Sequence, residues 1–174
     1  MHRLIVLLRG VNVSGHNKVP MAELRSALDA AGFANVATYI QSGNIALDTD
    51  ADPHVVTGQV EQLLVEHFDV AVPVVSIAQR DVVGVLEAAP VDSEANPSYQ
   101  LIYFPGGEVD VAGVDAIDRT KYAGDEITAK ANAVYVAYGD GQSKSKLTVK
   151  ALEKAAGTTL TGRNIKSTAK LIDL

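Results

Sequence analysis

The sequence contains no cysteine, which excludes disulfide bonds, thiolate metal sites and cysteine nucleophiles. Tryptophan is also absent and aromatic residues make up only 5% of the chain, so the core must be built from Val, Leu, Ile and Ala. The apolar run after Arg3 is about six residues long, far below the roughly 18–20 that a membrane-spanning helix needs. We therefore predict a soluble, cytoplasmic protein with no membrane partner. The apolar content of 47% in 174 residues is ample for one globular domain or for two small halves that share a core.

Positive charge is concentrated at the C-terminal end of the chain. The net charge is −6, but residues 142–174 hold seven basic side chains against two acidic ones, so this segment carries +5 and the rest −11. A positive segment on an acidic body favours a localised anion site over general nucleic-acid binding, which usually needs a basic domain. The alternative is a set of solvated lysines on helix surfaces, and the lysines taken alone fit that interpretation better.

The first half of the chain predicts a split βαβ unit. Its apolar periodicity gives the order strand, helix, strand, strand, helix, strand over residues 4–8, 20–31, 36–40, 45–47, 53–68 and 70–77. Pro53 stands at a first helical position, with Asp52 before it as the N-cap. Gly43 and Asn44 are expected to take positive φ angles in the hairpin turn. Pro73 interrupts the last strand, which places that strand near a sheet edge.

The second half repeats this order loosely. Helices are predicted at 81–88, 111–117, 147–156 and 162–172, and strands at 99–104, 126–130 and 134–138. The predicted fold is therefore α+β, with two ferredoxin-like halves packed as one compact unit with a C-terminal helix. We place the division between residues 1–80 and residues 81–174.

Three polar segments interrupt the apolar structure with side chains that bind anions or amides. They are the loop at 9–18, the turn at 41–44, and residues 139–146 together with 163–170. Arg163, Ser167 and Lys170 fall at i, i+4 and i+7 of the last predicted helix, a face that can hold a phosphate or a carboxylate.

The segment 139–146 leads into a predicted helix. Free backbone N–H groups at a helix start, with a serine and lysines beside them, predict an anion cradle. The alternative is an ordinary serine-capped helix.

The sequence contains no complete metal-binding or phosphate-binding motif. The aspartates at 48, 50 and 52 resemble a calcium loop, but Pro53 and Gln59 replace the required Gly and Glu. The glycines at 10 and 15 have Walker A spacing, but His16 and Asn17 replace Lys and Ser/Thr. No metal site or cofactor is therefore expected.

Catalytic motifs are equally incomplete. Ser143 with Lys146 and Ser167 with Lys170 match S-x-x-K without its companion motifs. The four histidines lack metal-ligand spacing, and only His16 could act as a general acid or base, the alternative being a solvated loop histidine. Whether the protein is an enzyme stays open.

Four stretches resemble the bacterial family known as domain of unknown function 1697. They are LLRGVNVSGHNKVPM at 7–21, TYIQSGN at 38–44, SKL at 145–147 and RNIKSTAKL at 163–171, and together they span nearly the whole chain. This chain has Ser14, Ile165 and Ser167 where the family has Gly, Trp and Thr. The isoleucine removes an aromatic ring, which weakens a nucleobase-stacking role at that position. The resemblance implies an α+β fold of two ferredoxin-like halves and no established activity.

The family's polar positions coincide with the segments chosen on chemical grounds, so we treat them as one composite site joining the two ends of the chain. These positions are Arg9, Asn12, Lys18, Gln41, Ser42, Asn44, Ser145, Lys146, Arg163, Asn164 and Lys170. The leading hypothesis is a small phosphorylated or carboxylated ligand, a nucleotide among the candidates, bound between the N-terminal loop and the C-terminal helix. The basic side chains neutralise its charge, and the amides fix its orientation.

Two alternatives stay open. The first is RNA or DNA binding by the basic C-terminal segment, although no RNP-like aromatic cluster accompanies the tyrosines of the predicted strands and the overall charge is acidic. The second is a structural or protein-interaction domain, in which the polar residues cap helices and close hairpins and Arg163 is a buried clamp on backbone carbonyls or an acidic partner. The sequence does not predict the oligomeric state.

Overall fold

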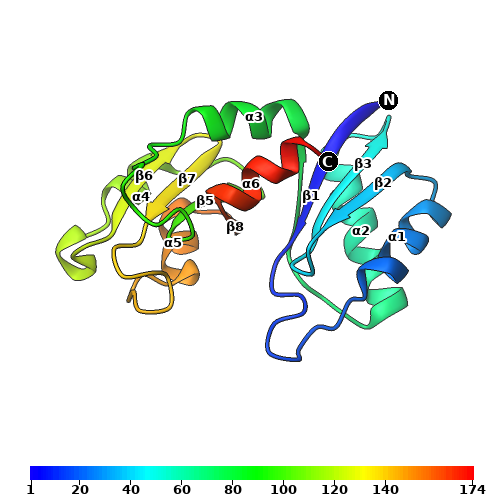
Figure 1. The fold of residues 1–174 in the computed structure, drawn as a ribbon, viewed down its shortest axis with the longest axis horizontal. Helices are drawn as coiled ribbons and strands as arrows, with labels where there is room; N and C mark the ends of the chain where they lie inside the picture. Colours follow the sequence, from blue (N-terminus) through cyan, green and yellow to red (C-terminus); the bar gives the residue numbers. More distant parts are fainter. The chain divides into compact units, whose positions relative to one another are not determined.

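The computed structural model describes residues 1–174. The chain divides into two compact units: unit 1 comprises Met1–Val83 and Lys170–Leu174, and unit 2 comprises Gly84–Ala169. Each unit contains one four-stranded antiparallel sheet with helices (Figure 1). The predicted α+β class is therefore confirmed. None of the helices is both long enough and apolar enough to span a membrane.

Unit 1 has the split βαβ order that the sequence predicts. Its elements are β1 (His2–Leu8), α1 (Met21–Ala30), β2 (Ala34–Tyr39), β3 (Asn44–Thr49), α2 (Pro53–Phe68) and β4 (Val74–Ala78). The sheet order is β2-β3-β1-β4, so β4 is an edge strand, as Pro73 indicates. Alternate residues of β1, such as Leu4 and Val6, join the apolar stripes of α1 and α2 in one buried core. Asp52 caps α2 as predicted, its Oδ1 accepting a hydrogen bond from the His54 backbone N–H at 2.9 Å.

Arg3 ties the C-terminal residue to the sheet of unit 1. Its Nε and Nη2 donate to the Leu174 carbonyl oxygen at 3.1 and 2.6 Å, and its Nη1 donates to Asp48 Oδ1 at 3.0 Å. Asn35 Nδ2 donates to the other Asp48 oxygen at 2.7 Å. These hydrogen bonds, from Asn35 first and Arg3 second, hold the pKa of Asp48 below its ordinary value.

Unit 2 repeats the topology of unit 1. Its strands are β5 (Gln100–Pro105), β6 (Glu126–Lys130), β7 (Ala133–Ala137) and β8 (Leu160–Asn164), in the sheet order β6-β7-β5-β8. Its helices are α4 (Val111–Asp115), the 3₁₀ helix η1 (Arg119–Tyr122) and α5 (Val149–Ala156). The division between the units falls inside α3 (Gln79–Glu87) and α6 (Ile165–Ile172). The core of unit 2 packs the inner faces of β5 and β7 against α4 and α5.

The predicted helix at 162–172 is wrong in its first turn. Residues Leu160–Asn164 form strand β8, in which Arg163 pairs with Ile102 of β5. Helix α6 begins only at Ile165, because Asn164 Oδ1 accepts a hydrogen bond from the Ser167 backbone N–H at 2.8 Å and acts as an N-cap. Arg163 therefore does not share a helix face with Ser167 and Lys170.

Candidate functional site

The N-terminal loop of unit 1 folds on itself as a small hairpin. Ser14 and Gly15 have φ angles of 49° and 79°, and the His16 backbone N–H donates to the Val13 carbonyl at 2.9 Å. Positive φ angles at both central positions identify a type I′ turn. The imidazole of His16 is exposed and has no hydrogen bond to an acidic or basic side chain.

Asn12 holds this loop against the turn between β2 and β3. Its Nδ2 donates to the carbonyls of Val19 at 2.9 Å and Gln41 at 2.7 Å, and its Oδ1 accepts from the Val19 N–H at 2.9 Å. Both amide hydrogens are thus donated to the protein backbone. The sequence predicted that the Asn12 side chain orients a ligand, whereas its hydrogen bonds in the structure orient the loop.

The turn between β2 and β3 is built around a buried asparagine. Asn44 is fully buried, and its Nδ2 donates to the Tyr39 carbonyl at 3.1 Å and to Ser42 Oγ at 2.9 Å. Positive φ angles occur at Ile40 (50°) and Gly43 (76°), so the prediction of a positive φ at Asn44 is wrong. The reason is that Asn44 already belongs to β3, where it pairs with Tyr39.

Six of the predicted site residues lie at this end of unit 1. They are Arg9, Asn12, Lys18, Gln41, Ser42 and Asn44. Lys18 and Gln41 are exposed, whereas the amides of the two asparagines serve the fold.

Unit 2 contains an open groove of about 510 Å³ with two walls. The first wall runs from Thr120 to Asp125 and the second consists of residues 139–146, apart from Gln142 and Ser143. In the first wall, the Asp125 N–H donates to the Tyr122 carbonyl at 2.9 Å and Gly124 has a φ of 95°, which together give a type II turn. The second wall is most of the loop between β7 and α5, which the sequence singled out.

The two walls meet at a pair of glycines. A Cβ on Gly139 would lie 2.6 Å from the Gly124 carbonyl oxygen, so only glycine allows this approach. Asp125 joins the walls on the same side: its Oδ1 accepts from the Gly139 N–H at 3.2 Å and its Oδ2 from the Ser145 hydroxyl. Ser145 Oγ in turn accepts from the Leu147 N–H at 2.9 Å. The predicted ligand residue Ser145 is therefore part of the framework of the groove.

A buried tyrosine pair anchors the second wall to the core. Gln142 Nε2 donates to the Tyr103 hydroxyl at 2.9 Å, and the hydroxyls of Tyr103 and Tyr138 lie 2.7 Å apart. Burial raises the pKa of both phenols, and for Tyr138 the neighbouring Tyr103 adds to the effect. Both hydroxyls stay protonated at neutral pH and act as hydrogen-bonding groups.

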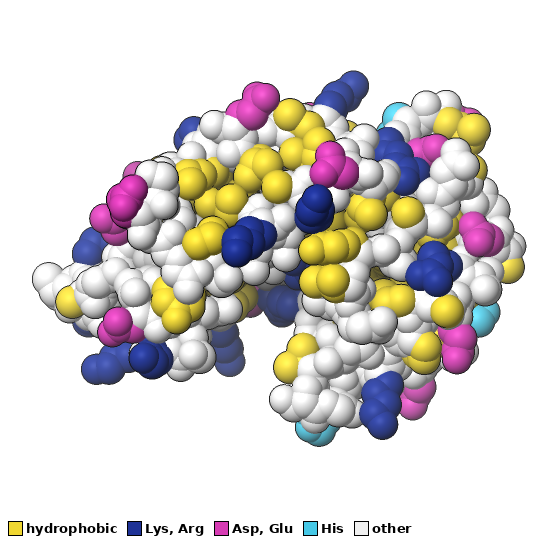
Figure 2. Space-filling model, viewed as in Figure 1, with side chains coloured by type: hydrophobic (Ala, Val, Ile, Leu, Met, Phe, Trp, Pro, Cys, Tyr) yellow, Lys and Arg dark blue, Asp and Glu magenta, His cyan; other side chains and the backbone are white.

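Three lysines line the groove, and all three are exposed: Lys121 in the first wall, and Lys144 and Lys146 in the second. Figure 2 shows Lys and Arg side chains, in dark blue, gathered along the lower edge of unit 2, where Figure 1 draws the loop between β7 and α5. Lys146 was a predicted site residue, Lys144 lay in the predicted loop, and Lys121 was missed. Nothing in the sequence connects Lys121 to that loop, because the contact is made through turns.

The helix after the loop is not part of the groove. Thr148 is the N-cap of α5, its Oγ1 accepting from the Ala151 N–H at 3.1 Å, so the helix start is an ordinary hydroxyl-capped one, as the alternative predicted, with a threonine in place of the serine. Any anion cradle in this region is formed by the loop and its lysines.

The remaining predicted site residues lie in β8 and α6. Arg163 Nη1 donates to the Gly162 carbonyl at 2.8 Å, and burial lowers the pKa of Arg163 to about 10, so the guanidinium stays charged at neutral pH. Asn164 is used as the cap of α6. Lys170 belongs to unit 1, and its Nζ lies 3.9 Å from Asp173 Oδ2. The composite site that joins the two ends of the chain stays a prediction.

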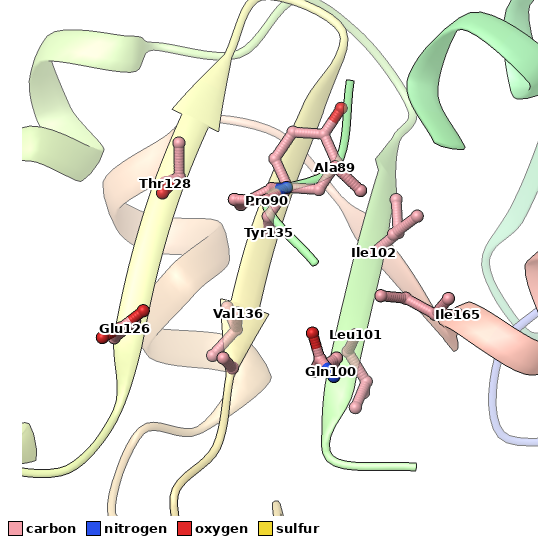
Figure 3. A pocket seen from close by; sticks show the side chains of 11 residues that line it. Ala89, Pro90, Gln100, Leu101, Ile102, Glu126, Thr128, Tyr135, Val136 and Ile165 are labelled. Carbon is pink, nitrogen blue, oxygen red and sulfur yellow. The ribbon is translucent and has the colours of Figure 1, made fainter. Parts of the chain in front are cut away.

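A second cavity of unit 2 is too small for a ligand. It lies between the sheet and the segment at Ala89 and Pro90, with Ile165 at its side, and its volume of about 20 Å³ holds roughly one water molecule (Figure 3). Its buried Gln100 is satisfied by Asp92, whose N–H donates to Oε1 at 2.8 Å and whose carbonyl accepts from Nε2 at 2.9 Å. No three His, Asp or Glu side chains gather in a way that would hold a metal ion.

Comparison with known proteins gives a family and a fold. The sequence pattern of the family described as "Protein of unknown function (DUF1697)" matches residues 1–135. The structure of the conserved bacterial protein SP0830 from Streptococcus pneumoniae is similar over 98% of this chain and 97% of that chain, with a TM-score of 0.74 and 24% sequence identity. At this identity the likeness establishes the fold alone. No curated protein matches the sequence significantly. Two of the four stretches that resemble the family, at 145–147 and 163–171, lie outside the matched residues. The match covers most of the chain, which therefore belongs to the DUF1697 family of proteins of unknown function.

Proposed function

We propose that this protein binds a small phosphorylated anion in the groove of unit 2. The observation that carries the proposal is that both walls of one open groove bear exposed lysines. Lys121 lies in the first wall, and Lys144 and Lys146 lie in the second, so a ligand between the walls is approached by positive charge from two directions. An ammonium is a compact point charge that suits phosphate oxygens.

Carboxylates in and beside the groove offset part of the positive charge of the three lysines. Asp125 accepts hydrogen bonds from the Gly139 N–H and the Ser145 hydroxyl. Asp140 is exposed. Asp118 lies outside the groove lining, but its Oδ2 is 3.8 Å from Lys121 Nζ, so three carboxylates accompany the three ammonium groups. The proposal therefore depends on the placement of the lysines on both walls, which lets them contact different oxygens of one ligand and favours a ligand with several charged oxygens over a monocarboxylate.

The framework of the groove supports a preformed site. The Gly139–Gly124 approach holds the two walls together, and the Gln142–Tyr103 hydrogen bond ties the loop of the second wall to the core, so little backbone ordering is needed when a ligand binds. The volume of about 510 Å³ lies in the range typical of small-molecule sites.

Calorimetric titration with inorganic tripolyphosphate tests this proposal. We expect binding to the wild type and at least a tenfold weaker affinity for the double variant Lys144→Ala/Lys146→Ala, since each lost charge-assisted hydrogen bond is worth about 1.5–3 kcal/mol. The matched control is Lys150→Ala/Lys154→Ala, which removes the same charge from α5, outside the groove lining. The control should bind within about twofold of the wild type.

Two results would contradict the proposal. Absence of binding to the wild type removes it directly. Equal weakening in the groove variant and in the α5 control means that the anion responds to the general positive field of the C-terminal segment and not to the groove.

A further inference from the structure

We infer that the anion bound in this groove is a nucleoside phosphate, a phosphate ester that carries a planar base. This inference rests on the proposed function of the groove and names its ligand class. It is carried by Tyr122, the one aromatic side chain among the residues that line the groove.

Tyr122 is held in place by the fold. Its backbone carbonyl accepts from the Asp125 N–H at 2.9 Å in the type II turn, and its half-buried ring packs against the hydrophobic core of unit 2. A ring that is already immobilised loses little conformational entropy when a second ring contacts it. Stacking of a base on such a ring is tolerant of base identity, because every base has a π-face.

The ring and the positive charge belong to the same groove. Lys121 directly precedes Tyr122 in the first wall, and the lysines of the second wall face the same open space. Three glycines also line the groove, Gly124, Gly139 and Gly141, and the close approach of Gly139 to Gly124 sets the distance between the walls where they meet. A ligand with a flat apolar part and a charged tail matches this composition better than a bare phosphate does.

Binding assays with three small ligands separate the ring from the charge. Inorganic tripolyphosphate, a nucleoside triphosphate and the corresponding nucleoside are titrated into the wild type, Tyr122→Leu and Tyr122→Phe. We expect the nucleoside triphosphate to bind wild type about tenfold more tightly than tripolyphosphate, a gain of the size that base–aromatic stacking provides. The leucine variant should lose this advantage and keep its tripolyphosphate affinity, and the phenylalanine variant should retain both.

A matched control is Tyr39→Leu, which removes a half-exposed ring from unit 1. Both affinities should be unchanged in this variant. If Tyr122→Leu does not fold, as judged by its circular dichroism spectrum, the wild-type ratio of the two phosphate ligands and the Tyr122→Phe variant still decide the inference.

The outcomes distinguish this inference from the proposed function. Equal affinity of wild type for tripolyphosphate and for the nucleoside triphosphate overturns the nucleoside assignment and leaves the anion site standing. No binding of either ligand overturns both. A single-stranded oligonucleotide that binds more tightly in proportion to its length, with a steep loss of affinity at higher salt, overturns the small-ligand assignment in favour of a polyanion surface.

Discussion

Replacing Asn12 by alanine tests whether the N-terminal loop is a structural element of unit 1 or a ligand-binding loop. The substitution removes three hydrogen bonds, to the Val19 carbonyl, the Val19 N–H and the Gln41 carbonyl, all between 2.7 and 2.9 Å. It leaves the N–H of the fully buried Val19 without its partner. It also places an alanine at a φ of 55°, in the left-handed region.

The expected loss of stability follows from these contacts. Each hydrogen bond contributes about 1 kcal/mol net, and the left-handed alanine costs about 1 kcal/mol more. We therefore expect Asn12→Ala to lower the free energy of unfolding by about 3–4 kcal/mol. For a chain of this size, that loss corresponds to a decrease in melting temperature of roughly 6–16 °C.

Two matched variants separate the contributions, with stability measured by urea unfolding followed by circular dichroism. Asn12→Gly keeps the left-handed backbone without strain, so it should be about 1 kcal/mol more stable than Asn12→Ala. Asn17→Ala loses one exposed hydrogen bond, to the Gly10 carbonyl, at a φ of 49° and should cost only about 1–2 kcal/mol. A loss below about 1 kcal/mol in Asn12→Ala would refute this reasoning and return the side chain to the predicted ligand-binding role.

Three further predictions concern a tight turn and two sets of ionisable groups. Gly43→Ala places a Cβ 2.6 Å from a leucine Cβ of β1 at a φ of 76°, so it should cost about 2–4 kcal/mol in urea unfolding. Gly32→Ala, at a φ of 93° in open space, should cost only about 1–2 kcal/mol. Tyr103 and Tyr138 should stay protonated in an absorbance titration beyond pH of about 10, and stability should fall there because the unfolded phenols release protons that the folded ones retain. The hydrogen bonds that lower the pKa of Asp48 stabilise the fold above a pH of about 4, and this stabilisation is lost as the pH falls. Asp48→Asn should therefore flatten the acid side of the profile of stability against pH; an unchanged slope would contradict the assignment.

The fold was predictable because each half has short-range signals that agree with its topology. Asp52 before Pro53 identifies the start of α2, Gly32 follows the end of α1, and Pro73 places β4 at an edge. These residues act on their own turns of the chain, so their effect can be inferred without tertiary contacts.

Strand β8 shows where such inference fails. The sequence Leu160–Asn164 contains a glycine and three polar residues, and its helical spacing with α6 outweighs any strand signal. The strand exists because it pairs with β5, and Gly162 is required there since a Cβ would lie 2.6 Å from Tyr103 Cε1. The one local signal was Asn164 three residues before Ser167, a capping pair that marks the start of the helix.

The groove was only half predictable for a related reason. The loop at 139–146 was singled out from the sequence because its glycines, serines and lysines interrupt the apolar pattern, and recognising such a segment needs no three-dimensional information. Its partner wall comes from residues far upstream, and the two meet through the backbone of Gly139 and Gly124 and through the carboxylate of Asp125. Neither hydrophobic periodicity nor motif spacing encodes a contact between two turns. Lys121 and Tyr122 consequently become candidates only when the fold is known, and these are the two residues that distinguish a ligand groove from a lysine-bearing surface.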